Sequence, residues 1–187
     1  MTLQLTRRRF SVDDYHRMVE AGILGEDDRV ELIEGEILEM SPIGPRQAAC
    51  VDRLTRLFFR GLGDEVIVRV QNPVNPRPDS EPQPDITLLR SRADFYSQRH
   101  PGPDAILLIV EVAEASLDYD RGIKHRLYAR SGIQELWIVD LEGETVEVCR
   151  EPVTDRYRDI RIAQRGETVS PGSFPDLTLR VDDILGS

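Results

Sequence analysis

The sequence predicts a single α/β domain in which helices pack against a mixed central β-sheet. Residues 105–112 form an almost unbroken apolar run, which is typical of a strand covered on both faces. Residues 65–71 alternate along the chain in the pattern of a second strand. Residues 46–60 place apolar side chains at helical spacing, so a helix is expected to cover the sheet.

Capping and turn residues set the boundaries of the other elements. Ser11 and Asp14 form a capping box that begins a short helix, and Gly22 ends it. Residues 30–40 carry apolar side chains on both sides of Glu34-Gly35, which predicts a β-hairpin. The further elements expected in chain order are a proline-rich loop at 72–84, a strand at 85–89, a polar irregular segment at 91–103, a helix from Asp118 or Asp120 to about Ser131 that ends at Gly132, a strand at 135–141, a second hairpin turning at 142–143 into a strand at 145–149, a strand at 156–163 and a short mixed tail at 174–185.

Length and composition fit one globular domain spanning residues 1–187. Hydrophobic residues make up 40% of the chain, yet no apolar run approaches the roughly 20 residues that a membrane helix needs. Nothing at the N-terminus resembles a signal peptide, so we expect a cytoplasmic protein. Cys50 and Cys149 lie far apart and are expected to be reduced thiols.

The net charge of −10 argues against binding nucleic acid through the overall field, because such domains are usually basic. A metal-dependent nuclease nevertheless gathers carboxylates, and local basic patches can lie on an acidic body. Candidate patches are the arginines at 7–9 and the group Arg53, Arg56 and Arg60. For each group taken alone, a solvated face is the favoured explanation.

Two acidic residues lie at expected strand ends. Asp85 follows Pro84, whose ring fixes the backbone entering the strand, so the carboxylate of Asp85 is expected at the end of the sheet and not in its middle. A lone Pro-Asp step is also common in loops. Glu111 follows the apolar run, and its charge is costly to bury unless it is paired or bound to metal. The alternative is that the strand ends at Glu111 and leaves the carboxylate in water.

A lysine and a third acid complete the candidate site. Lys124 lies on the helix after the Glu111 strand, where Arg121, Lys124 and Tyr128 share a face at spacings of three and four. A surface ion pair with Asp120 would explain Lys124 without catalysis. Glu31 lies in the first hairpin and points away from the side of Leu32, which also suits a solvated edge strand.

These residue types suit a divalent cation. Mg²⁺ prefers oxygen ligands and is usually held by one or two carboxylates and several waters. Crowded carboxylates would raise one another's pKa in the absence of a cation. A nearby lysine could orient the attacking water or offset charge developing on phosphorus. The three histidines, His16, His100 and His125, share no ligand spacing with either cysteine, so zinc is not indicated.

An ordered set of short motifs spans about residues 10–155. The set comprises Val30-Glu-Leu-Ile-Glu-Gly-Glu36, Ser41-Pro, Gln83-Pro-Asp-Ile86, Ile109-Val-Glu-Val112, Asp120 through Lys124 to Tyr128, and Gly132-Ile-Gln-Glu-Leu-Trp-Ile-Val-Asp140. This order resembles the Uma2 family of predicted restriction endonucleases, which is similar to the PD-(D/E)xK nuclease superfamily.

The resemblance implies a restriction-endonuclease-like core with flanking helices and added β-hairpins. It implies that Asp85 and Glu111 hold Mg²⁺ or Mn²⁺ and that Glu31 is the acid supplied by the N-terminal part. The usual lysine position, two residues after the acidic strand residue, is Ala113 here, so that role passes to Lys124. A histidine found after the Ser-Pro turn in many relatives is absent, and Arg46-Gln47 stands in its region. Gln47 and Tyr128 are therefore candidate pocket residues without an assigned role.

The expected function is metal-dependent endonucleolytic hydrolysis of DNA, with Asp85, Glu111, Lys124 and Glu31 as catalytic residues. The alternative is a nuclease-fold module that has lost catalysis and serves binding or assembly, which the negative charge and Ala113 favour. A DNA mimic ranks last, because the acidic residues form no long runs. By analogy with other nucleases of this fold, a homodimer without membrane association is expected.

Overall fold

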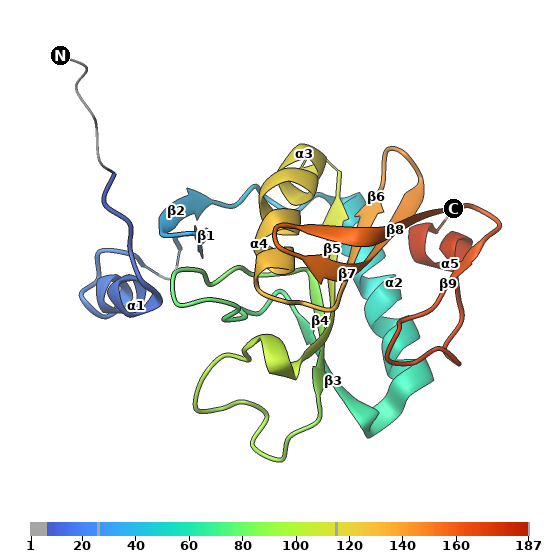
Figure 1. Ribbon diagram of the computed structural model, residues 1–187, viewed down its shortest axis with the longest axis horizontal. Helices are drawn as coiled ribbons and strands as arrows, with labels where there is room; N and C mark the ends of the chain where they lie inside the picture. Colours follow the sequence, from blue (N-terminus) through green and yellow to red (C-terminus); the bar gives the residue numbers. More distant parts are fainter. Residues whose placement is uncertain (1–6, 26, 115, 187) are drawn as a thin grey trace.

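The computed structural model describes residues 7–25, 27–114 and 116–186, and its centre is a six-stranded mixed sheet (Figure 1). The strands lie in the order β3-β4-β5-β6-β7-β8, and only β5 and β6 pair in parallel. This arrangement confirms the expected mixed sheet. The strands are β3 (Val66–Val70), β4 (Ile86–Arg90), β5 (Ile106–Ala113), β6 (Glu135–Asp140), β7 (Thr145–Val153) and β8 (Arg156–Gln164).

Two helical layers cover the central strand β5 from opposite sides. Leu108, Val110 and Val112 belong to the hydrophobic cluster built with α2 (Pro45–Leu62). Ile109 belongs to the cluster built with α4 (His125–Arg130). Because successive side chains of a strand point to opposite faces, Glu111 faces the α4 side. Figure 1 shows α3 and α4 on one side of the sheet and α2 on the other.

The connection from β5 to β6 is helical but irregular. It comprises α3 (Leu117–Tyr119), the π-helical segment η3 (Asp120–Lys124) and α4, so the helix begins before the expected cap residues. A π-helical turn contains an extra residue and shifts the face that each side chain occupies. Ile123, which helical spacing predicts on the apolar side, is therefore 37% exposed, whereas Lys124 is buried.

The N-terminal part forms a small unit of its own, with α1 (Val12–Glu20), β1 (Val30–Ile33) and β2 (Glu36–Glu39). The capping box that begins α1 is present as predicted. Glu34 and Gly35 both have positive φ, as a type I′ hairpin turn requires, and a Cβ on Gly35 would lie 2.6 Å from Cβ of Arg9. The backbone N–H of Glu81 donates to the carbonyl of Leu32 at 2.7 Å, so the proline-rich loop ties β1 to the sheet.

The C-terminal part is more ordered than the sequence predicts. Strands β7 and β8 form a longer hairpin than expected, and β9 (Thr168–Val169) pairs with β10 (Leu179–Arg180). Helix α5 (Val181–Leu185) follows and packs on the α2 side of the sheet, while two short 3-10 turns, η1 (Gly63–Glu65) and η2 (Pro103–Ala105), precede β3 and β5. Every helix among the described residues is too short or too polar to span a bilayer.

Candidate active site

Strand pairing brings Asp85 and Glu111 to the same end of the sheet. Ile86 pairs with Val110 in the antiparallel β4–β5 ladder, so Asp85, one residue before β4, stands opposite Glu111. The backbone N–H of Val112 donates to Oδ2 of Asp85 at 2.8 Å. Both carboxyl groups are buried, with exposed fractions of 8% and 3%. Glu111 therefore lies within its strand and not in water.

Two glutamine amides hold the carboxylate of Asp85. Nε2 of Gln71 donates to Oδ1 at 3.2 Å. Nε2 of Gln47, from the first turn of α2, lies 3.4 and 3.3 Å from the two oxygens. The Gln47 contacts are longer than typical N–H···O bonds, so the amide caps the carboxylate loosely. Gln47 thus lies in the candidate site, as the sequence suggested.

Lys124 approaches Glu111 from the opposite helical layer. Its Nζ lies 3.2 Å from Oε1 of Glu111 and 3.5 Å from Oε2 of Glu31, and the residue is 5% exposed. The hydroxyl of Tyr128 donates to the same Oε1 of Glu111 at 2.6 Å. Lys124 thus pairs with these two glutamates and not with Asp120. It is also the only lysine in the chain, since arginine supplies every other basic side chain.

Glu31 is part of this cluster and not of a solvated edge. Its Oε1 accepts a hydrogen bond from the Tyr119 hydroxyl at 2.9 Å, and its Oε2 accepts one from the backbone N–H of Gln83 at 3.1 Å. Only 3% of the residue is exposed. The small N-terminal hairpin therefore contributes an acid to the end of the central sheet.

Several residues at the site were missed by the sequence reasoning, and one residue was misplaced. Asp120 is buried beside Lys124 and accepts a hydrogen bond from Oγ of Ser116 at 2.7 Å. The spacing of four residues between Asp120, Lys124 and Tyr128 was the sequence feature that could have placed Asp120 at the site. Arg121, expected on the face of Lys124, instead donates to Glu147 and Asp140. The other missed residues, for which the sequence carries no comparable signal, are Gln71, Gln83 and Tyr119.

The cluster contains more negative than positive groups. Burial raises the pKa of Glu111 to about 8, and Asp120 and Asp85 add to this increase while Lys124 and Tyr128 oppose it. Burial likewise raises the pKa of Asp120 to about 6. Burial alone would lower the pKa of Lys124, but the carboxylates of Glu111, Glu31 and Asp120 outweigh it and hold that pKa above its usual range. Lys124 is thus an ammonium at neutral pH, and the cluster favours further positive charge.

The donor set suits one kind of metal ion. Asp85 and Glu111 offer carboxylate oxygens only, and the described residues contain no group of three or more His, Cys, Asp or Glu that could hold a metal ion of any kind, so water would have to supply the remaining ligands. Structural zinc sites need such a closed set of ligands. Mg²⁺ commonly binds one or two carboxylates and completes its shell with water. The residues present therefore fit Mg²⁺ or Mn²⁺ better than zinc.

Because the pKa of Glu111 is raised, we predict that the free energy of unfolding in metal-free buffer depends on pH. A carboxyl whose pKa rises from 4.5 in the unfolded chain to about 8 in the folded protein binds its proton more tightly when folded. Its contribution to stability is complete below pH 4.5 and is lost as pH rises through about 8. The loss is at most about 1.4 kcal/mol per pH unit. Urea unfolding in EDTA should show the free energy of unfolding of the Glu111→Gln variant falling less steeply over this range than that of the wild type. Parallel curves would show that Glu111 titrates normally.

Comparisons with known proteins concern the family and the fold of this chain. The model of the Uma2 family, described as "Putative restriction endonuclease", matches residues 12–182. A similar solved structure is that of "a putative nuclease belonging to DUF820" from Anabaena variabilis ATCC 29413. It has a TM-score of 0.74 and 18% sequence identity, over 94% of this chain and 97% of that chain. This likeness confirms the expected nuclease-type α+β fold. None of the curated proteins matches the sequence. The family match covers most of the chain, and the chain therefore belongs to the Uma2 family.

Proposed function

We propose that this protein is an endonuclease that hydrolyses phosphodiester bonds in DNA with Mg²⁺ or Mn²⁺ held by Asp85 and Glu111. The observation that carries the proposal is the position of Lys124. The only lysine of the chain is buried, and its Nζ lies 3.2 Å from the carboxylate of Glu111. An acid pair can hold a divalent ion, and a nearby ammonium can offset negative charge on the phosphoryl oxygens, so these groups can support metal-dependent phosphodiester hydrolysis.

Each residue has a role that follows from its contacts. Asp85 is fixed by the backbone N–H of Val112 and the amide of Gln71, so its carboxylate is oriented before any ligand arrives. Glu111 is fixed by the Tyr128 hydroxyl. Glu31 helps to hold the ammonium of Lys124 at the site. These contacts would preserve the geometry of the acids and the amine during turnover.

The reaction adds water across one P–O bond of the DNA backbone and yields a phosphate monoester and a hydroxyl group. A bound divalent ion would polarise a phosphoryl oxygen and lower the pKa of a bound water. The Lys124 ammonium is placed to orient the attacking water or to offset negative charge that develops on the phosphoryl oxygens. Such electrostatic effects are strong in a buried site, because few water molecules screen them.

The same burial favours a second candidate function. Asp85, Glu111 and Lys124 are each less than a tenth exposed, and none lines either of the two cavities described for this protein. A closed ionic cluster could stabilise a nuclease fold that serves only as a binding or assembly module. In that case the protein would neither need a divalent ion nor cleave DNA.

Plasmid cleavage by the purified protein separates the two functions. The nuclease proposal expects supercoiled DNA to be converted to nicked or linear forms in Mg²⁺ or Mn²⁺, and no conversion in EDTA. An inactive module would leave the plasmid intact under every condition. Activity that persists in EDTA would contradict the metal-dependent mechanism.

A further inference from the structure

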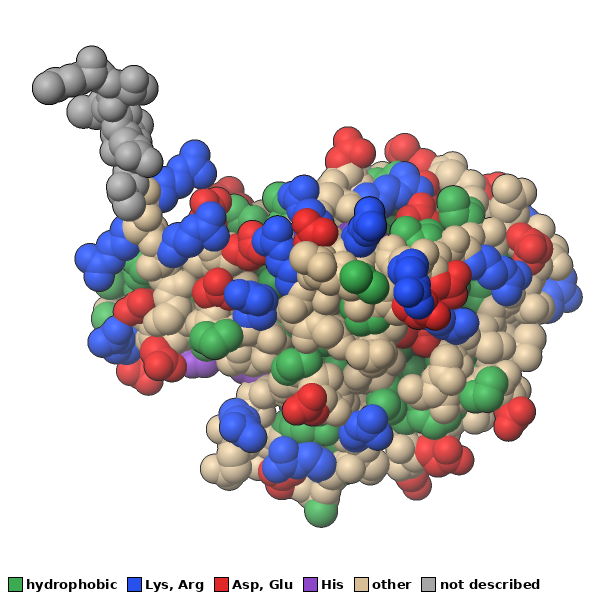
Figure 2. Space-filling model, viewed as in Figure 1, with side chains coloured by type: hydrophobic (Ala, Val, Ile, Leu, Met, Phe, Trp, Pro, Cys, Tyr) green, Lys and Arg blue, Asp and Glu red, His purple; other side chains and the backbone are tan. Residues whose placement is uncertain are grey.

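A second polar site lies at the opposite end of strands β4 and β5. It is an open cavity of about 690 Å³ between the proline-rich loop and the segment that joins the two strands. Its basic lining residues are Arg77, Arg90, Arg92, Arg99 and His100, and Asp104 is the only acid among the lining residues. Figure 2 shows arginine side chains over these loops, with acidic side chains among them; the loops are the green to yellow-green segments of Figure 1. The cavity is therefore basic on a protein whose net charge is −10.

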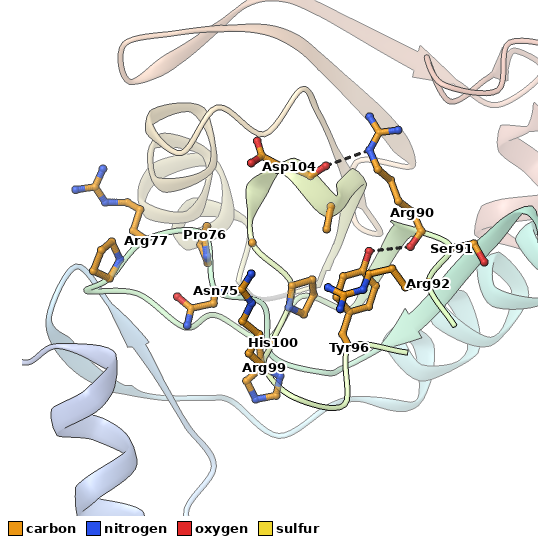
Figure 3. Close-up of a pocket in the computed structure, with 14 residues that line it drawn as sticks. Asn75, Pro76, Arg77, Arg90, Ser91, Arg92, Tyr96, Arg99, His100 and Asp104 are labelled. Atoms are coloured by element: carbon orange, nitrogen blue, oxygen red, sulfur yellow. Dashed lines mark hydrogen bonds between the residues drawn. The ribbon is translucent and has the colours of Figure 1, made fainter. Parts of the chain in front are cut away.

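The arginines that line the cavity differ in whether their guanidinium groups already have a hydrogen-bond or ion-pair partner. Nε of Arg90 donates to the carbonyl of Asp104 at 3.1 Å, and Figure 3 shows its guanidinium directed away from the centre. Arg77 pairs with Asp79 and lies at the rim. Arg99 is exposed and has no ion pair or hydrogen bond with any of the described residues, and Figure 3 shows its guanidinium toward the centre of the view. Arg99 is thus the guanidinium most available to a ligand.

The neighbouring Arg92 is held in place by an aromatic ring and by Asp94, whose Oδ2 accepts a hydrogen bond from its Nη2 at 2.6 Å, so Arg92 is a secondary contact beside Arg99. Its guanidinium carbon lies 4.7 Å from the ring centroid of Tyr96, within the range of cation–π contacts. Tyr96 is 6% exposed, and its hydroxyl donates to the carbonyl of Arg90 at 2.8 Å. The ring is therefore a fixed support, and Arg92 loses little conformational freedom when it binds a ligand.

We propose that this cavity binds the phosphate group of a nucleotide through Arg99 and Arg92. Guanidinium groups form bidentate, charge-assisted hydrogen bonds with phosphate oxygens, and Asn75 adds an amide donor beside them. The phosphate can belong to the backbone of a DNA duplex or to a free mononucleotide. The chemistry of recognition is the same in both cases.

The cavity is distinct from the acid cluster. Ala105, which lines it and directly precedes β5, lies six residues before Glu111, a separation of about 20 Å at the rise of a β-strand. That separation corresponds to about six steps of duplex DNA. If the proposed nuclease function holds, a duplex could contact both sites at once, but phosphate binding here requires neither metal nor cleavage.

Binding measured in EDTA tests the proposal independently of catalysis. Fluorescence anisotropy would report the binding of a labelled duplex, and calorimetry would report the binding of deoxyadenosine monophosphate. Both would be measured with the wild type, Arg99→Gln and Arg180→Gln. Arg180 is exposed in β10, whose neighbouring residues pack on the α2 side of the sheet, so this control removes the same charge elsewhere.

We expect Arg99→Gln to raise the dissociation constant about tenfold, the usual effect of losing one charge-assisted hydrogen bond. For the duplex, the slope of log affinity against log salt should also fall by about one. Loss of duplex binding identifies a backbone phosphate, and loss of mononucleotide binding identifies a free nucleotide. Equal binding of both ligands by Arg99→Gln and Arg180→Gln, or no binding by the wild type, would overturn the proposal. These binding measurements contain no divalent ion and the plasmid cleavage test requires one, so failure of the nuclease proposal would be seen separately.

Discussion

Substitution of Lys124 by methionine is expected to lower the free energy of unfolding by about 3–5 kcal/mol. Methionine has a similar length and no charge, so the variant removes the ammonium with little change in packing. The carboxyl groups of Glu111 and Glu31 then remain buried without their cation, so each must stay charged without a partner or take up a proton, and both outcomes cost free energy. Urea unfolding at pH 8 in EDTA measures the effect.

A matched control keeps this prediction specific. Arg126 is an exposed basic residue on the same helix, α4, and Arg126→Met should change stability by less than about 0.5 kcal/mol. Adding Glu111→Gln to Lys124→Met should recover part of the loss, because it removes one of the unpaired acids. Equal stabilities of Lys124→Met and Arg126→Met would show that the ammonium does not hold the cluster together.

The second large effect concerns activity. Asp85→Asn should reduce metal-dependent cleavage of plasmid DNA by about 10³-fold or more, as expected when a group that stabilises transition-state charge is removed. Asparagine has the same shape and can still accept the hydrogen bond from Val112, so the fold should be retained. It lacks the negative charge that holds a divalent cation. Initial rates of plasmid nicking in Mg²⁺ provide the measurement.

The control for this loss is a substitution of the same type at a distant acid. Asp64 is exposed in the short turn before β3, and Asp64→Asn should cleave DNA at the wild-type rate. Equal cleavage by the Asp85 and Asp64 variants, prepared in the same way, would identify a contaminating nuclease. The assignment of Asp85 to the active site would then be wrong.

The sequence predicts those features of the site that depend on regular structure. The apolar run before Glu111 predicts a buried strand, and its pairing with the strand after Asp85 brings the two acids together. The helical spacing of Lys124 and Tyr128 places both side chains on one face, and both reach Glu111. Here local periodicity and tertiary packing favour the same arrangement.

The features that the sequence does not predict depend on irregular backbone. The π-helical segment directs Arg121 to Glu147 and leaves Ile123 exposed, whereas an ideal helix would group them differently. Gln71 and Gln83 reach the acids from residues that follow β3 and precede β4, where no periodicity identifies the direction of a side chain. The short β9–β10 pair was missed because two-residue strands have no pattern of their own.

The most direct test of the metal centre is anomalous X-ray diffraction from a crystal of this protein soaked in Mn²⁺. We expect an anomalous peak within about 2.2 Å of one oxygen from each of Asp85 and Glu111, a typical distance for metal–oxygen ligation. The same soak with an Asp85→Asn crystal should lose the peak. A wild-type crystal that shows full Mn²⁺ occupancy elsewhere and none between these two carboxylates would contradict the account.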